Sequence, residues 1–112
     1  MAFDEGTAEI LRGDLDGLPG LTERRMFGGL AFLLDGHMVS GVHRGGAMYR
    51  VGPARQDEAL AIPGTSRMTM GGKGRLMSGM IAADEDLLAD DARRRRLLAI
   101  ALDVVRSLPP KK

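Results

Sequence analysis

The sequence predicts an α+β fold, in which an antiparallel-rich sheet of about five strands is flanked by an N-terminal and a C-terminal helix. Apolar residues recur at helical spacing near both ends of the chain, while the middle alternates with the period of a strand. Two turn signals, Asp35-Gly36 and Gly45-Gly46, are of the kind that close tight hairpins. Because 112 residues suffice for one hydrophobic core and no long linker divides them, we expect a single domain over residues 1–112.

The first helix is expected to begin after Asp4, whose side chain can cap it, and to run to about Asp16. Gly17 and Pro19 are residues that end helices. The positions that recur at helical spacing are Phe3, Thr7, Ile10, Leu11, Leu15 and Leu18.

The middle of the chain is expected to form a meander of three antiparallel strands, over residues 30–34, 37–44 and 47–51. Its two turns place Leu34 opposite His37 and Arg44 opposite Ala47. Side chains alternate along a strand, and directly opposed residues share a side of the sheet. This register therefore divides the meander into two faces.

One predicted face is small and apolar, and we expect it to lie beneath the helices. It comprises Ala31, Leu33, Met38, Ser40, Val42, Ala47, Tyr49 and Val51. The other face is an apolar floor that carries two histidines and an arginine, and it is the candidate interaction face. Its simpler interpretation is a surface partly covered by loops. The candidate residues are Leu30, Phe32, His37, Val39, His43, Met48 and Arg50.

The rest of the chain predicts a short helix, two strands and a long helix. Pro53 is typical of a first helical position, and it favours a short helix over 53–60. Strands are expected over 67–70 and 76–81, separated by the glycine-rich turn 71–74. The acids at 84–86 can cap a long helix that runs to about residue 107.

Composition excludes several classes of function. The chain has no cysteine, which excludes disulfides, thiolate zinc sites and iron–sulfur clusters and fits a cytoplasmic location. Its formal net charge of +1 creates no global attraction to nucleic acid or anionic membrane. We expect neither a signal peptide nor a membrane span, because acids occupy the N-terminus and no apolar stretch approaches about 18 residues.

No pattern of chemically active residues predicts an enzyme, so we expect no catalytic residue, cofactor or metal. His37 and His43 stand six residues apart, which separates them by roughly 20 Å on one strand. Ser40 lies inside a strand, without the strand-to-helix elbow of a hydrolase nucleophile. The glycines at 71–74 lack the spacing of a phosphate-binding Walker loop, and Gly28-Gly29 favours a bulge or a close backbone approach instead.

Local basic groups leave nucleic-acid binding open. The run Arg93 to Arg96 spreads around its helix, and Asp90 and Asp91 stand four residues before Arg94 and Arg95. A solvated, self-paired face is therefore the leading interpretation, with a phosphate-binding stripe as its alternative. The better candidate phosphate contacts are three loop cations without nearby acids in sequence. They are Arg67, Lys73 and Arg75. Arg24 and Arg25 are additional candidate contacts in the same hypothesis.

The stretch over residues 23–53 resembles the N-terminal domain of the TfoX/Sxy family. The resemblance is carried by the hairpin over 33–38, by the run Met48 to Val51, and by a motif at the start of the stretch. That motif is Arg25, Met26, Phe27, Gly28 and Gly29. Weaker similarity extends through the strands over 64–81 and the terminal helix.

The resemblance implies an α+β fold similar to secretion-chaperone-like domains and an association with transcriptional regulation of natural competence. Longer members of the family continue into a second, mainly helical domain, whereas this sequence ends at residues 109–112 and resembles a stand-alone N-terminal domain. The family supplies no catalytic role for the motif residues.

Two hypotheses follow for the function. The first is a non-enzymatic regulatory or adaptor domain that binds a protein partner or a second copy of itself, through the candidate interaction face or a sheet edge. The alternative is a nucleic-acid-binding accessory protein that uses the local basic loop patch. Neither hypothesis involves a membrane.

Overall fold

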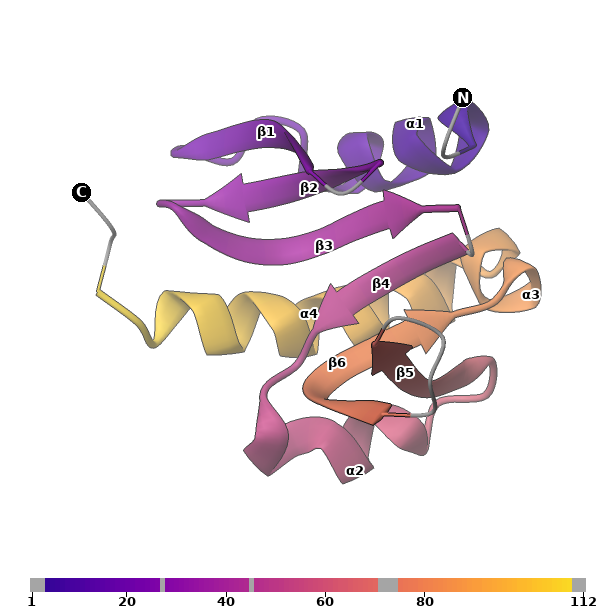
Figure 1. Ribbon diagram of the computed structural model, residues 1–112. Coiled ribbons are helices and arrows are strands. Elements are labelled where there is room, and N and C mark those ends of the chain that lie inside the picture. Colours follow the sequence, from indigo (N-terminus) through magenta and orange to yellow (C-terminus); the bar gives the residue numbers. More distant parts are fainter. Residues whose placement is uncertain (1–3, 27, 45, 71–74, 110–112) are drawn as a thin grey trace.

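In the computed structural model, which describes residues 4–26, 28–44, 46–70 and 75–109, six antiparallel strands form one sheet. The strand order across the sheet is β1-β2-β3-β4-β6-β5 (Figure 1). The strands are β1 (Leu21–Met26), β2 (Gly29–Leu34), β3 (His37–His43), β4 (Gly46–Arg50), β5 (Thr65–Met70) and β6 (Arg75–Ala83). The helices are α1 (Glu5–Leu15), the 3-10 turn η1 (Pro53–Arg55), α2 (Gln56–Leu60), α3 (Glu85–Ala89) and α4 (Asp91–Arg106).

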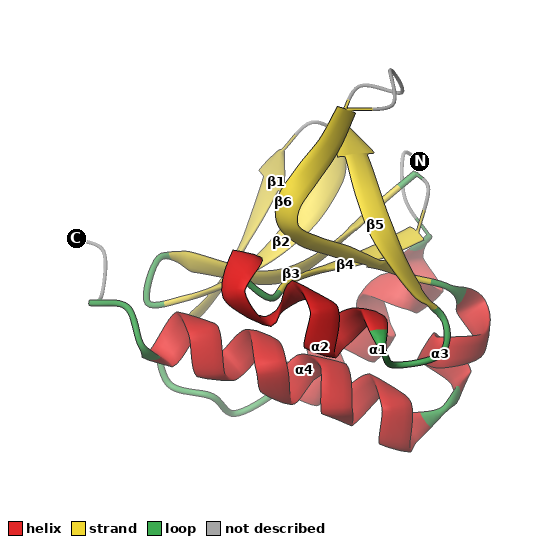
Figure 2. Cartoon of the chain, turned by 90° about the horizontal axis from the view of Figure 1, so that it is seen from below, coloured by secondary structure: helices red, strands yellow, loops and turns green. Residues whose placement is uncertain are grey.

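The helices gather on one side of the sheet, and the sheet curves away from them toward both of its edges (Figure 2). We call the side that faces the helices the helix face and the other side the open face. The predicted α+β class and the terminal helices are confirmed, with one strand more than expected. That strand, β1, lies at an edge of the sheet, where exposed polar residues mask the alternation by which strands are recognised. Within the described part of the chain, no helix is long and apolar enough to cross a membrane.

The predicted start of the first helix is confirmed. The Asp4 carboxylate accepts a hydrogen bond from the Thr7 backbone N–H at 2.8 Å, which lowers the pKa of Asp4. At the other end of the chain, the single long helix that we expected is divided into α3 and α4. Asp90 has extended backbone angles and caps α4 through the backbone N–H of Arg93, so the helix restarts there.

The turns of the meander fit the prediction only in part. Leu34 pairs with His37 as expected, through a tight turn in which Asp35 and Gly36 both have positive φ. The next turn is displaced by one residue, because His43 pairs with Gly46 and the predicted Arg44–Ala47 pair is therefore wrong. Gly46 has a φ of 126°, an angle that glycine adopts freely, and it begins the strand instead of closing the turn.

A β-bulge between β2 and β3 overturns the predicted division of the faces. Leu33 pairs with Met38, but Phe32 pairs with Ser40, so Val39 is an extra residue on its strand. The bulge shifts the alternation by one residue. Leu30 and Phe32 therefore lie on the helix face, and Met38 lies on the open face.

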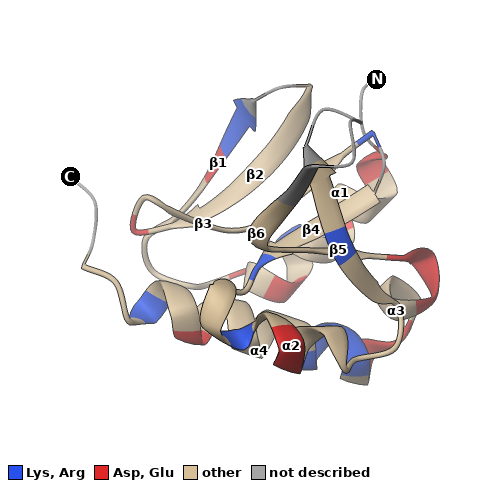
Figure 3. Ribbon diagram, turned by 60° about the horizontal axis from the view of Figure 1, so that its bottom comes forward, with Lys and Arg blue, Asp and Glu red and all other residues tan. Residues whose placement is uncertain are grey.

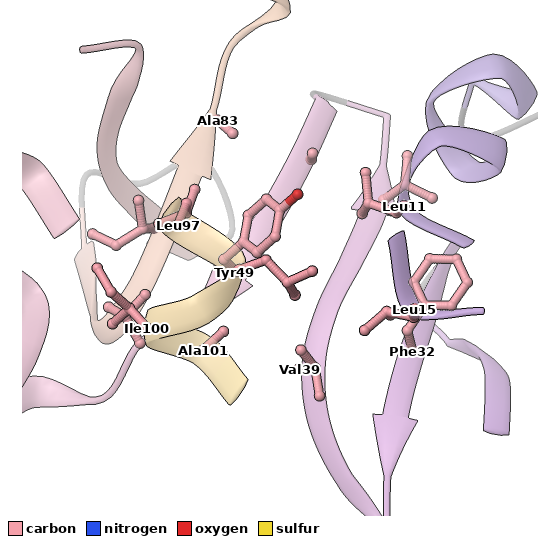
Figure 4. Close-up of a cluster of buried hydrophobic side chains, with 14 of the residues drawn as sticks. Leu11, Leu15, Phe32, Val39, Tyr49, Ala83, Leu97, Ile100 and Ala101 are labelled. Carbon is pink, nitrogen blue, oxygen red and sulfur yellow. The ribbon is translucent and has the colours of Figure 1, made fainter. Parts of the chain in front are cut away.

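The core fills the space between the helix face and the helices. Phe32 packs beneath Leu11 and Leu15 of α1, and Tyr49 lies against Leu97 of α4 (Figure 4). Burial raises the pKa of Tyr49, so its hydroxyl stays neutral. Among the described residues, the largest fully buried side chains are the two aromatic residues Phe32 and Tyr49, with aliphatic residues around them.

A buried arginine joins three of the helices. Arg94 is only 8% exposed, and its guanidinium donates to Asp14 of α1 at 2.6 and 3.2 Å. It also donates to the Leu88 carbonyl of α3 at 2.7 Å and lies 2.9 Å from Asp91. The predicted pairs of Asp90 with Arg94 and of Asp91 with Arg95 are wrong, because the acids bind Arg93 and Arg94 at a spacing of three.

Replacing Arg94 by alanine should lower the free energy of unfolding by about 3 kcal/mol, because it leaves Asp14 and the Leu88 carbonyl without their charged partner. Urea denaturation followed by circular dichroism measures this loss. Arg95→Ala is the matched control on the exposed side of α4, and it should change stability by less than about 0.5 kcal/mol. Equal effects of the two variants would show that the buried ion pair does not hold the helices.

Candidate interaction surface

An apolar pocket of about 300 Å³ opens on the sheet beside Gly29 and Leu30, where β2 begins. Five of the eight methionines of the chain line it, and these are all the methionines whose side chains the structure describes. Each of the five is partly exposed. We call the site the methionine pocket, and its lining is completed by Met38, His43, Met48, Met68, Met77 and Met80.

Neighbouring strands bring these methionines together from distant parts of the sequence. Met38 belongs to β3, Met48 to β4 and Met80 to β6, and these three strands are adjacent in the sheet. Met68 lies in β5 at a second register shift, which falls between Arg67 and Thr69. The pocket therefore exists only when the sheet is assembled.

Gly41 makes room for two of the methionine side chains. A Cβ atom at this position would lie 2.9 Å from the Met48 methyl carbon and 3.1 Å from the Met38 methyl carbon. It would also lie 2.9 Å from the backbone oxygen of Leu30, which cannot move aside as a side chain can. The missing side chain thus lets thioethers from two strands approach each other over the sheet.

Charges are distributed unevenly between the two faces. Glu23 is the only acidic residue in the six strands, and it shares the helix face with its partner Phe32. There the guanidinium of Arg12 donates to Glu23 at 2.6 Å, lowers the pKa of the carboxyl, and lies 5.9 Å from the Phe32 ring centroid. By register, Arg24 lies on the open face opposite Ala31, and Arg50 lies there opposite Met80.

His43 lies between the methionine pocket and a second, more polar cavity of about 410 Å³. The second cavity is lined by Asp4, Asp84 and Glu85 among others. Burial lowers the pKa of His43, so the folded protein favours the neutral imidazole. Among the residues that the structure describes, no three histidine, aspartate or glutamate side chains gather to hold a metal ion.

The structure separates the residues of the predicted interaction face. Leu30, Phe32 and Val39 are buried in the core at 6%, 0% and 0% exposure, so their assignment to an accessible face is wrong, although Leu30 still borders the methionine pocket. The cause is the bulge, which shifts by one residue the alternation of side chains between the two faces of the sheet. His37 is also buried, and its Nε2 lies 2.6 Å from the Pro109 carbonyl oxygen. The open face retains His43, Met48 and Arg50.

The predicted phosphate contacts are placed only in part. Arg67 is exposed on β5, whereas Arg75 begins β6 and its side chain lies outside the described residues, as does the whole of Lys73. The phosphate role of these residues stays a prediction.

The family motif spans the connection from β1 to β2. Arg25 and Met26 end β1, Gly28 has a φ of 76°, and Phe27 lies outside the described residues. A Cβ atom on Gly29 would lie 2.5 Å from the Val42 backbone oxygen. This contact confirms the predicted close backbone approach at the glycine pair.

Sequence reasoning missed Met68, Met77 and Met80. Their strands were expected, but no register tied those strands to the meander, so their faces were not assigned. The available signal was the content of eight methionines, but methionine is flexible and composition alone suggests that it fills gaps in a core. The five described methionines line the open-face pocket instead.

The sheet and its helix layer define a small α+β domain. Residues 14–105 match the family model of the TfoX N-terminal domain, so the chain belongs to this family. The match confirms the resemblance seen in the sequence, including its extension through the later strands and the terminal helix. The family is generally regulatory rather than catalytic. No curated protein and no solved structure matches the chain significantly.

Gly41→Ala should destabilise the protein by about 1–3 kcal/mol, because the new methyl group presses on the Leu30 backbone oxygen. Gly13→Ala is the matched control. It lies in α1 with no atom within 4 Å of its Cβ position, and it should stabilise the helix by about 0.5–1 kcal/mol. Urea denaturation of both variants gives the two changes, and a neutral or stabilising Gly41→Ala would contradict the tight packing at this position.

Stability should fall as the pH decreases from 7 to 5, because of His43. The unfolded chain takes up a proton on this residue near its ordinary pKa of about 6.5, while the folded protein does so only at lower pH. Protonation therefore favours the unfolded state in this window. His43→Gln should flatten the dependence of unfolding free energy on pH. Measurements stay above pH 5, away from the range in which Glu23 takes up its proton, since the hydrogen bond from Arg12 lowers the pKa of this carboxyl. An unchanged slope in the variant would exclude His43 as the cause.

Proposed function

We propose that this domain is a non-enzymatic regulatory or adaptor protein that binds a protein partner through the methionine pocket. The observation that carries the proposal is the apolar lining of a pocket on the open face of the sheet. Five partly exposed methionines line one pocket, so apolar surface stays in contact with water. An exposed apolar patch of this kind does not stabilise a monomer, and it is typical of a binding site.

Methionine suits a surface that has to adapt to its partner. The side chain is unbranched and its thioether is polarizable, so it can repack around apolar groups of different shape. A volume of about 300 Å³ lies at the small end of the roughly 300–1,000 Å³ that ligand pockets span. Such a pocket suits an apolar anchor side chain of a protein segment.

The sheet edges are less suited to partner binding than the pocket. β1 and β5 are the outer strands of the sheet. On β1 the four residues 22–25 are all exposed, and three of them are charged. Charged side chains on an edge strand hinder pairing with another strand. The open face therefore supports an interaction better than this edge does.

A second candidate function, nucleic-acid binding, rests on arginines of the sheet. Within the part of the chain that the structure describes, Arg24, Arg25 and Arg67 are exposed and form no ion pair. They are thus available for phosphates. Single strands also need aromatic platforms, but Phe32 and Tyr49 are buried on the helix face. The pocket favours a protein partner.

The test is selection from a random peptide library displayed on phage, with the wild-type domain as target. Met48→Glu combined with Met80→Glu should weaken the selected peptides at least about tenfold, because it places charge in an apolar pocket. Ile10→Glu is the matched control, since Ile10 is an exposed apolar residue on α1, at 38% exposure. It should leave the affinity unchanged, and circular dichroism confirms that both variants fold.

Selected peptides that bind the pocket variant and the wild type equally would overturn the proposal. Light scattering of the free protein tests the related possibility of a second copy as partner. A mass that rises above the 12.0 kDa of the monomer, and returns to it in the Met48/Met80 variant, would make the partner another copy of this chain.

A further inference from the structure

The acidic residues are almost absent from the sheet. Of the fifteen acids, Glu23 lies in a strand and Asp35 in the turn after β2, while the others lie in helices or at their caps. Glu23 is on the helix face, where Arg12 neutralises it. In Figure 3 the strands are mostly tan with a few blue segments, and most of the red segments lie in the helix layer, which also carries blue ones. The open face therefore carries no strand carboxylate.

Arginines of the two layers differ in their partners. Arg12, Arg55, Arg93 and Arg94 each hold a carboxylate at 2.6–2.9 Å, although α4 also exposes further arginines. Among the described residues, Arg24 and Arg50 of the open face lie within 4 Å of no carboxylate. A guanidinium without an internal partner can bind an external carboxylate through two parallel hydrogen bonds.

Arg50 stands directly beside the methionine pocket. It pairs with Met80 across β4 and β6, and Met80 lines the pocket. Arg24 lies on β1, at the edge of the sheet. In register, Ala31 of β2 and Gly41 of β3 lie between Arg24 and Met48 of β4. A segment that crosses the sheet from β1 to β4 would therefore meet one cation on each of these two strands, with methionines of the pocket on the strands next to Arg50.

From this distribution we infer that the partner is an acidic protein segment: an apolar side chain enters the methionine pocket, and carboxylates flanking it bind Arg24 and Arg50. The inference rests on the proposed function and adds the chemistry of the partner. Complementary charge speeds association and excludes wrong partners more than it raises affinity. A basic segment would meet two unpaired arginines and be rejected.

Phosphates would also complement these arginines, but the pocket beside Arg50 favours a peptide. Its lining is thioether, aliphatic and imidazole, and no described phenylalanine or tyrosine side chain lies on the open face. Among the described residues, a base that entered it would find no six-membered aromatic ring on which to stack. Nucleic acid is therefore an outcome that the experiment distinguishes.

In the experiment, the phage-selected peptides whose binding depends on Met48 and Met80 are sequenced. Their affinity for the domain is then measured by fluorescence anisotropy at low and near-physiological salt. We expect enrichment of Asp and Glu beside an apolar residue. Arg24→Gln combined with Arg50→Gln should weaken these peptides about fivefold to tenfold and flatten the salt dependence. Arg95→Gln combined with Arg106→Gln removes the same charge from exposed positions of α4 and should change neither.

The outcomes separate the inference from the proposed function. Pocket-dependent peptides without acidic enrichment, or without sensitivity to Arg24 and Arg50, would overturn the inference and leave the adaptor function standing. A selection that yields no pocket-dependent peptide would overturn both. Labelled single-stranded or duplex nucleic acid that displaces the peptides, and binds through the same two arginines, would replace the acidic segment by a polynucleotide.

Discussion

The β-bulge in β3 is the constraint that decides which side chains of this domain are covered and which are open. Because Val39 is inserted opposite the step between Phe32 and Leu33, both Val39 and Ser40 turn toward the helices. Leu30 and Phe32 then form a continuous apolar layer with Val39, and Ser40 is a buried polar residue beside it. Met38, on the other side of the bulge, is left on the open face, where the methionine pocket forms.

The helix layer depends on this assignment, because it needs one continuous apolar surface on which to pack. α1 lies over Phe32, and α4 lies over the strands that follow it. Arg94 then joins α4 to α1 through Asp14 and to α3 through the Leu88 carbonyl. A buried ion pair adds specificity of arrangement more than net stability, since desolvation offsets much of the Coulombic attraction. The same layer collects nearly all of the acids and leaves the open face of the sheet to arginines.

Local signals predicted the frame of the fold well. Asp4, Asp35-Gly36 and Pro53 act on the backbone within a few residues, so their effects can be read without knowledge of the fold. Asp90 also acts locally as a cap, but it stands inside a helical pattern that continues on both sides, and the break was therefore missed. The strand β1 was missed because exposed residues 22–25 follow no apolar alternation.

The candidate site could be predicted only in fragments. His43, Met48 and Arg50 were assigned to the functional face, and Leu30, Phe32 and Val39 were assigned to it wrongly. A strand pattern has a period of two, so one inserted residue reverses every assignment beyond it, and a bulge leaves no reliable mark in a single sequence. Met68, Met77 and Met80 joined the site through the pairing of β4 with β6, which is a contact between residues about 30 positions apart.

The amino-acid sequence by itself determined the class of fold, the terminal helices, the turn between β2 and β3 and the family, because short-range backbone preferences and motif residues carry them. Tertiary structure alone decided the bulge, the order of the last two strands and the burial of Arg94. These features depend on long-range packing. The free energy of packing the whole core differs between alternative registers and helix positions, and this difference selects one arrangement. The methionine pocket belongs to the second group, because its lining comes from strands that only the assembled sheet brings together.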